Sequence, residues 1–138
     1  MSPAQRELIA EAVSVYKQVR LDLAGALPFW PLGLPRWADT WVALGMRGHP
    51  RSYLLIWRRG PQQAAGARRA PVPGGADGGG PAAMTVAVRH LRSQPATAQV
   101  LFPAGAVAHP RWDAASGELA VTLPAAPAAA LICLATSS

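Results

Sequence analysis

The spacing of the apolar residues changes near Trp41, and this change constrains the fold more than any other feature of the sequence. Before residue 28 the apolar residues recur every three or four positions, as they do along one face of an α-helix. After residue 40 they stand in short runs or alternate with polar residues, as they do in β-strands. The sequence therefore predicts one long N-terminal α-helix followed by a mainly β region.

The predicted helix covers residues 3 to 24. Ser2 is suited to cap its N-terminus, Pro3 suits the first helical position, and Gln5 completes the spacing of a capping box. Gly25 is a stop signal. The apolar stripe of this helix is wide, and we expect it to pack against a large apolar partner. The stripe consists of Leu8, Ile9, Ala12, Val15, Tyr16, Val19, Leu23 and Leu27.

A connector and a β-hairpin are predicted next. Residues 28 to 40 contain three prolines, a glycine and two tryptophans, so we expect a packed segment without regular structure. The hairpin has strands at 41–47 and 52–58, joined by a turn at 48–50 that contains a glycine and a proline. Both strands are apolar at nearly every position, which predicts that they are covered on both faces.

The remaining strands follow a segment of different composition. Residues 60 to 83 are rich in Gly, Ala, Pro and Arg, and we expect a disordered insertion there because little apolar surface can be buried. Short apolar or alternating runs separated by turn residues then predict an antiparallel β-sandwich. These runs lie at 84–89, 99–102, 106–112, 118–123 and 130–135. The chain thus divides into a helix at 1–27 and a sandwich domain at 28–138.

The net charge of +6 raises the question of nucleic-acid binding. Twelve of the thirteen basic residues are arginines, and they are dispersed along a sequence whose Ala, Gly and Pro content is typical of a high-GC genome. Aromatic residues do not interleave with them as in proteins that bind single strands. We therefore expect a solvated basic surface and no nucleic-acid partner.

The sequence carries no pattern typical of a membrane-spanning helix or of an export signal. No segment approaches the roughly 20 apolar residues that a membrane-spanning helix needs. The N-terminus lacks the basic-then-apolar order of a signal peptide. The sequence predicts no membrane association and a cytoplasmic location.

The residues that usually carry catalysis or bind metals do not form a motif. His49, His90 and His109 lie 41 and 19 residues apart, which matches no metal-ligand spacing, so each is predicted to be a surface histidine. Cys133 stands in an apolar run and is predicted to lie in the core. Asp113 is predicted to stabilise a hairpin turn. We predict no catalytic residue, no metal and no cofactor.

The five tryptophans offer a different kind of site, because flat aromatic faces stack on sugar rings. Trp30, Trp41 and Trp57 stand in apolar segments, and burial in the core is the favoured interpretation for them. Trp37 and Asp39 are the candidate sugar contacts, since Asp39 is the only carboxylate in an aromatic setting. A packing or capping role for Asp39 within its loop is favoured over a catalytic one.

The sequence contains, in this order, blocks at residues 15–17, 28–33, 41–45, 52–59, 101–103, 112–113 and 119–124. Their order resembles the C-terminal end of bacterial α-galactosidases of glycoside hydrolase family 36. In that family the last helix of a catalytic barrel is followed by a small β-sandwich. The resemblance covers nearly all of the chain outside the 60–83 segment, and its blocks are structural. In the family, the catalytic aspartates come from barrel strands upstream, and no position of this chain matches them.

The resemblance implies a structural or accessory sandwich domain that is inactive alone and whose partner is the catalytic barrel of an α-galactosidase. It also implies an α-galactoside as the sugar. A carbohydrate-binding module and an interaction partner of a separate barrel are the alternatives. Self-association through the N-terminal helix is expected as well, because its apolar stripe has no predicted partner. A fragment, a mis-started gene and a standalone protein all fit a chain that opens directly into this helix.

Overall fold

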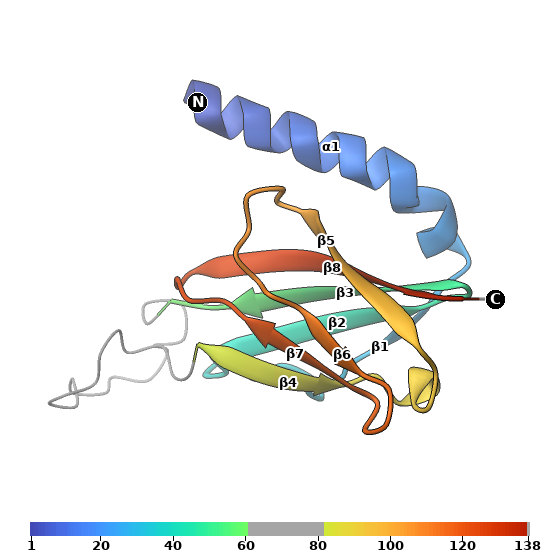
Figure 1. Cartoon of the computed structure of the whole chain (residues 1–138). Coiled ribbons are helices and arrows are strands. Elements are labelled where there is room, and N and C mark those ends of the chain that lie inside the picture. Colours follow the sequence, from blue (N-terminus) through green and yellow to red (C-terminus); the bar gives the residue numbers. More distant parts are fainter. Residues whose placement is uncertain (61–81, 138) are drawn as a thin grey trace, which may run out of the picture.

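The computed structural model describes residues 1–60 and 82–137, and this part of the chain is mainly β, as predicted (Figure 1). One helix, α1 (Pro3–Ala24), precedes two antiparallel sheets. The larger sheet contains, in spatial order, β1 (Leu27–Phe29), β2 (Trp41–Arg47), β3 (Arg51–Arg58), β8 (Ala128–Thr136) and β5 (Ala96–Phe102). The smaller sheet contains β4 (Ala83–Ala87), β7 (Glu118–Thr122) and β6 (Arg111–Asp113). A short 3₁₀ helix, η1 (Arg89–Leu91), follows β4.

The ends of α1 agree with the local sequence signals. The Ser2 hydroxyl accepts a hydrogen bond from the Gln5 amide at 3.2 Å, and the Gln5 side chain accepts one from the Ser2 amide at 2.8 Å. This reciprocal capping box satisfies two backbone donors that a helix start would otherwise leave free. Gly25 caps the C-terminus, so the predicted bounds are confirmed.

The core of the sandwich lies between the two sheets. Inward-facing side chains of both sheets alternate with outward-facing ones, which places every second residue of a strand in the core. Leu119 and Val121 of β7 therefore meet Ile132 of β8 from the opposite sheet. The largest fully buried side chains are Leu54, Ile56, Val86, Val88, Leu119, Val121, Leu123, Ile132 and Leu134.

The opposite face of the larger sheet is covered by α1 at one end only. Val19 of α1 packs on Tyr53 and Cys133, and Leu23 supports this small second cluster. Leu55 and Trp57, farther along the same face, keep part of their surface exposed. The expectation that the hairpin strands are covered on both faces is therefore confirmed near Tyr53 and wrong toward Trp57, because the N-terminal half of α1 rises away from the sheet (Figure 1).

Two predicted segments differ from the observed ones. The connector is not wholly irregular, because β1 pairs with β2 and sets Phe29 opposite Gly45. A Cβ at Gly45 would lie 2.2 Å from the Phe29 ring, so this close approach requires glycine. The strand predicted at 106–112 is limited to β6, since His109 has a φ of 36° and breaks the extended backbone.

The predicted disordered insertion lies, apart from its ends, outside the described residues. Gly60 at its start and residues 82–83 at its end are described, and Ala83 already belongs to β4. No helix in the described part of the chain has the length and apolar character needed to cross a membrane.

Candidate functional site

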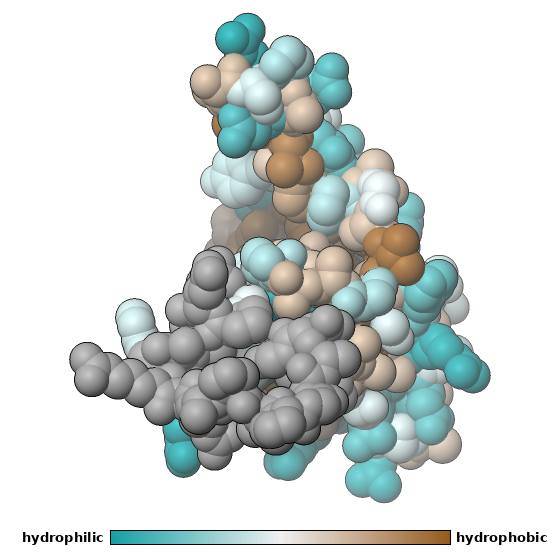
Figure 2. All heavy atoms as spheres, turned by 90° about the vertical axis from the view of Figure 1, so that its left-hand side faces the viewer, coloured by the Kyte–Doolittle hydropathy of each residue, from teal (hydrophilic) through white to brown (hydrophobic). Residues whose placement is uncertain are grey.

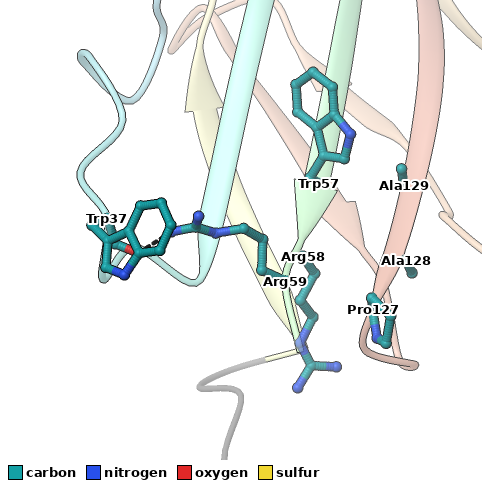
Figure 3. A pocket seen from close by; sticks show the side chains of 7 residues that line it. All are labelled: Trp37, Trp57, Arg58, Arg59, Pro127, Ala128 and Ala129. Atoms are coloured by element: carbon teal, nitrogen blue, oxygen red, sulfur yellow. Dashed lines mark hydrogen bonds between the residues drawn. The ribbon is translucent and has the colours of Figure 1, made fainter. Parts of the chain in front are cut away.

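A cavity of about 640 Å³ opens beside the end of β3, on the side where the chain enters β8 (Figure 3). Two tryptophans form its aromatic surfaces, and small residues of β8 form a low wall. The described residues that line it are Trp37, Trp57, Arg58, Arg59, Pro127, Ala128 and Ala129.

Arg59 holds the loop that brings Trp37 to this cavity. Its Nε donates to the Asp39 carbonyl at 2.7 Å, and its Nη2 donates to the Trp37 carbonyl at 2.7 Å. The same Nη2 group reaches the Arg36 carbonyl at 3.0 Å. In Figure 3 the Arg59 side chain extends from the end of β3 toward Trp37. A single guanidinium thus fixes three backbone carbonyls, and Trp37 is presented with 74% of its surface exposed.

Trp57 reaches the cavity through the alternation of β3. It pairs with Ala129 across the β3–β8 ladder, and the small alanine leaves one face of the indole open. Arg58, the next residue, points to the opposite side and is 3% exposed. Its Nη1 donates to the carbonyls of Leu123 and Pro124 at 2.8 and 2.9 Å, which holds the segment leading to Pro127.

The two candidate sugar contacts are separated by the structure. Trp37 lines the cavity, whereas Asp39 is absent from its described lining. The Asp39 carboxylate accepts a hydrogen bond from the Arg36 amide at 2.8 Å, which is the capping role favoured by the sequence. Sequence reasoning did not identify two residues that line the cavity, Trp57, which was predicted to lie in the core, and Arg59. The alternation that buries Leu54 and Ile56 does place Trp57 on the other face, and this signal could have identified it.

The chemistry available in the cavity is that of binding. Indole faces supply apolar contact, the Arg59 guanidinium supplies positive charge beside Trp37, and none of the described lining residues carries a carboxylate. A concave, mostly apolar surface with a few polar groups is typical of small-molecule sites. The arrangement suits a flat-faced polar ring such as a sugar.

The other tryptophans follow different patterns. Trp41 is 6% exposed in the core, as predicted. Trp30 is 41% exposed, so its predicted core role is wrong, because the connector turns its side chain toward the surface. Trp112 is partly buried and its indole N–H donates to the Gln94 carbonyl at 2.9 Å.

His49 and His109 are exposed as predicted, whereas His90 is half-buried. Its Nε2 lies 2.9 Å from the Ser52 hydroxyl, and its ring stands edge-on to Phe29 with centroids 5.2 Å apart. Burial, and then the nearby Arg47 guanidinium, lowers the pKa of His90. The imidazole is therefore held neutral at neutral pH.

The remaining candidates have structural roles. Cys133 is buried, as predicted, and this burial raises the pKa of its thiol. Asp113 accepts hydrogen bonds from the amides of Ala115 and Ser116, which stabilises the predicted turn, and bonds from Ser116 lower the pKa of this carboxyl. Within residues 1–60 and 82–137, no three His, Cys, Asp or Glu side chains gather in a way that could hold a metal ion.

Comparison of the chain with protein-family models, with curated proteins and with solved structures found no match.

Proposed function

We propose that this chain is an accessory β-sandwich domain of an α-galactosidase-like glycoside hydrolase, inactive by itself, which docks on a catalytic barrel through α1. The sequence blocks that resemble family 36 support the pedigree, and the order of one helix followed by a sandwich agrees with it. The family's catalytic aspartates have no counterpart in this chain.

Several carboxylates take part in hydrogen bonds or ion pairs within the fold, and this supports a structural role. Glycoside hydrolysis requires two carboxyl groups about 5 to 10 Å apart across the scissile bond. Here Glu11 accepts a hydrogen bond from the Ala104 amide and so ties α1 to the segment after β5. Asp22 pairs with Arg51 at 2.9 Å, and Asp39 and Asp113 accept bonds from loop amides. These four carboxylates are used to hold the fold together.

The uncovered apolar face of α1 is the observation that carries the proposal. Leu8, Ile9 and Tyr16 belong to the stripe whose C-terminal part packs on the sheet, yet they are 46%, 53% and 59% exposed. Figure 2 shows α1 projecting from the body of the protein with hydrophobic side chains on its surface. Apolar patches of this kind mark protein–protein contacts. A barrel surface of matching apolar character is the proposed occupant.

Co-expression tests this docking. A family 36 barrel that lacks its own last helix and sandwich would be produced with this chain, and co-purification and hydrolysis of a nitrophenyl α-galactoside would be measured. We expect Ile9→Glu to abolish the complex. Leu21→Glu is the matched control, because Leu21 is 81% exposed on the opposite face of α1.

Two outcomes would contradict the proposal. One is a complex that forms equally well with Ile9→Glu and with Leu21→Glu. The other is turnover of the galactoside by the purified chain alone, since that would require catalytic carboxylates within it.

A second candidate function, sugar binding, is favoured by the two indoles of the Trp37 cavity. Calorimetric titration with galactose and melibiose should then give binding in the millimolar range or tighter. Trp37→Ala should remove it, whereas Trp30→Ala, outside this cavity, should leave it unchanged. Binding that survives Trp37→Ala would place the sugar elsewhere.

A further inference from the structure

A second cavity, of about 420 Å³, lies where the connector after β1 faces the end of β4 and η1. Phe29 lines it from the end of β1, Trp30 from the connector and Arg47 from the end of β2. Arg89 and His90 line it from η1. The cavity therefore joins the two sheets at one end of the sandwich. It is separate from the Trp37 cavity, with which it shares no lining residue.

The inner wall of this cavity is rigidly built. Ser52 is 1% exposed, and its hydroxyl contacts both the His90 imidazole at 2.9 Å and the Gly48 carbonyl at 3.2 Å. Phe29 packs against the other side of His90 and lies in the space left by Gly45. His90 is thus held from two strands, β1 and β3, which gives the cavity a fixed wall.

The charges at the cavity are all of one sign. Arg47 and Arg89 are both exposed at its rim, and in the described part of the chain neither forms an ion pair. None of the described lining residues is acidic. Arg47 lies close enough to His90 to act on its charged form, so the guanidinium and the imidazole are neighbours. Two uncompensated guanidiniums beside a neutral imidazole favour an anion.

Trp30 adds an apolar surface to this basic rim. It lines the cavity and is 41% exposed, so its indole is open to a ligand. A guanidinium binds a phosphate or carboxylate through paired N–H donors, and an indole stacks on a ring. Guanidinium groups beside an indole therefore suit a ligand that carries a phosphate or carboxylate group on a ring.

We propose that this cavity binds an anionic sugar, with Arg47 and Arg89 holding its phosphate or carboxylate group and Trp30 stacking on the ring. This site goes beyond the proposed accessory role and does not depend on it, because an α-galactoside is neutral. His90 serves as the positioned wall that sets the depth of the site.

Calorimetry of the whole chain at low ionic strength tests the proposal with four probes. Inorganic phosphate alone should bind weakly, and galactose 1-phosphate should bind at least fivefold more tightly because the ring adds its contact with Trp30. Galacturonate would report a carboxylate instead of a phosphate preference. Galactose, which is neutral, should not bind at this cavity.

Matched variants identify the residues responsible. Arg47→Gln and Arg89→Gln should each weaken galactose 1-phosphate roughly tenfold, since each removes a charge-assisted hydrogen bond. Arg111→Gln changes the net charge by the same amount on β6, outside the cavity lining, and should have no more than a twofold effect. Trp30→Ala should remove the advantage of the sugar phosphate over inorganic phosphate. Melting curves of each variant establish that it is folded.

A spectroscopic measurement locates the ligand independently. Saturating galactose 1-phosphate should shift the NMR resonances of the His90 imidazole and leave those of the exposed His109 unchanged. The proposal is overturned if Arg111→Gln weakens binding as much as Arg47→Gln, because the attraction would then come from the net charge. It is also overturned if neither anionic sugar binds at millimolar concentration, or if galactose binds equally well to the Trp37→Ala variant, in which the Trp37 cavity no longer contributes.

Discussion

The Tyr53 hydroxyl donates a hydrogen bond to the Asp22 carboxylate and thereby joins β3 to the last turns of α1. The same carboxylate oxygen receives the Arg51 guanidinium at 2.9 Å. Asp22 is not part of the apolar stripe, and it anchors the helix at the margin of its packed segment. The orientation of α1 therefore depends on this polar contact as well as on the packing of Val19.

Removal of the Tyr53 hydroxyl should weaken the contact between α1 and β3. Tyr53 is 3% exposed, and a hydrogen bond to a charged acceptor contributes more than a neutral one. We expect Tyr53→Phe to lower the free energy of unfolding by about 1–2 kcal/mol, measured by urea denaturation. Tyr16→Phe, on the exposed part of α1, should change it by less than about 0.5 kcal/mol. Equal effects of the two substitutions would contradict the anchoring role.

Alkaline pH should break the hydrogen bond between Tyr53 and Asp22. Burial, and then the hydrogen bond to Asp22, raises the pKa of Tyr53 above its ordinary value of 10.0. The folded chain therefore holds this proton more tightly than the unfolded chain, so the stability is fully present below pH 10 and is lost as the pH rises above it. In a Tyr16→Phe background, the absorbance of tyrosinate should appear only together with unfolding. Tyrosinate formation in a fully folded protein near pH 10 would disprove this.

Acidification should act on His90 in the opposite direction. Its pKa is lowered by burial and by Arg47, so the unfolded chain binds the proton more readily than the folded one. Stability is therefore fully present above the ordinary pKa of 6.5 and is lost as the pH falls through the folded-state value. His90→Gln should reduce the loss of unfolding free energy between pH 8 and pH 5. His109→Gln, on the surface, should leave that loss unchanged.

Arg59 should control the loop that carries Trp37. Arg59→Ala removes the donor from three backbone carbonyls, and we expect a loss of about 1–3 kcal/mol in the free energy of unfolding. Chymotrypsin should then cleave after Trp37 faster than in the unmodified chain. Arg36→Ala is the control, because the hydrogen bonds of Arg36 seen here use its backbone. Protection of Trp37 in Arg59→Ala would show that another contact holds the loop.

The exposed face of α1 should cause self-association when no barrel is present. Each buried Leu or Ile side chain contributes roughly 1.5–3 kcal/mol, so pairing two copies of this face is favourable. Analytical ultracentrifugation of the chain should show a concentration-dependent dimer or larger species. Ile9→Glu should reduce it and Leu21→Glu should not. A clean monomer at high concentration would rule this association out.

Local signals made part of this structure predictable. The capping box at Ser2 and Gln5 involves residues three positions apart, and so the start of α1 could be read directly. The alternation of apolar and polar residues at 118–122 likewise predicts that Leu119 and Val121 face the core, and both are buried. The turn at Asp113 is equally local, since its carboxylate binds amides two and three residues away.

Contacts between distant segments account for what was missed. His90, predicted to be a surface histidine, is half-buried and contacts Ser52, which is 38 residues away in sequence. β1 is only three residues long, too short for a periodic pattern, and it exists because Phe29 fits over Gly45. Trp37 is a candidate from the sequence, but its anchor Arg59 is not. Arg59 bonds to backbone carbonyls, and every residue type carries a carbonyl, so no sequence pattern indicates this contact.

The place of β8 in the larger sheet has a consequence for biosynthesis. β8 lies between β3 and β5 and pairs with both, yet it follows every other strand in the sequence. During translation β1, β2 and β3 can assemble early as a three-stranded meander. β5 pairs with β8 at the edge of this sheet, so it emerges before its partner strand has been made. Residues 128–136 must therefore leave the ribosomal exit tunnel before β3 and β5 can pair with β8. The larger sheet is complete only after this step.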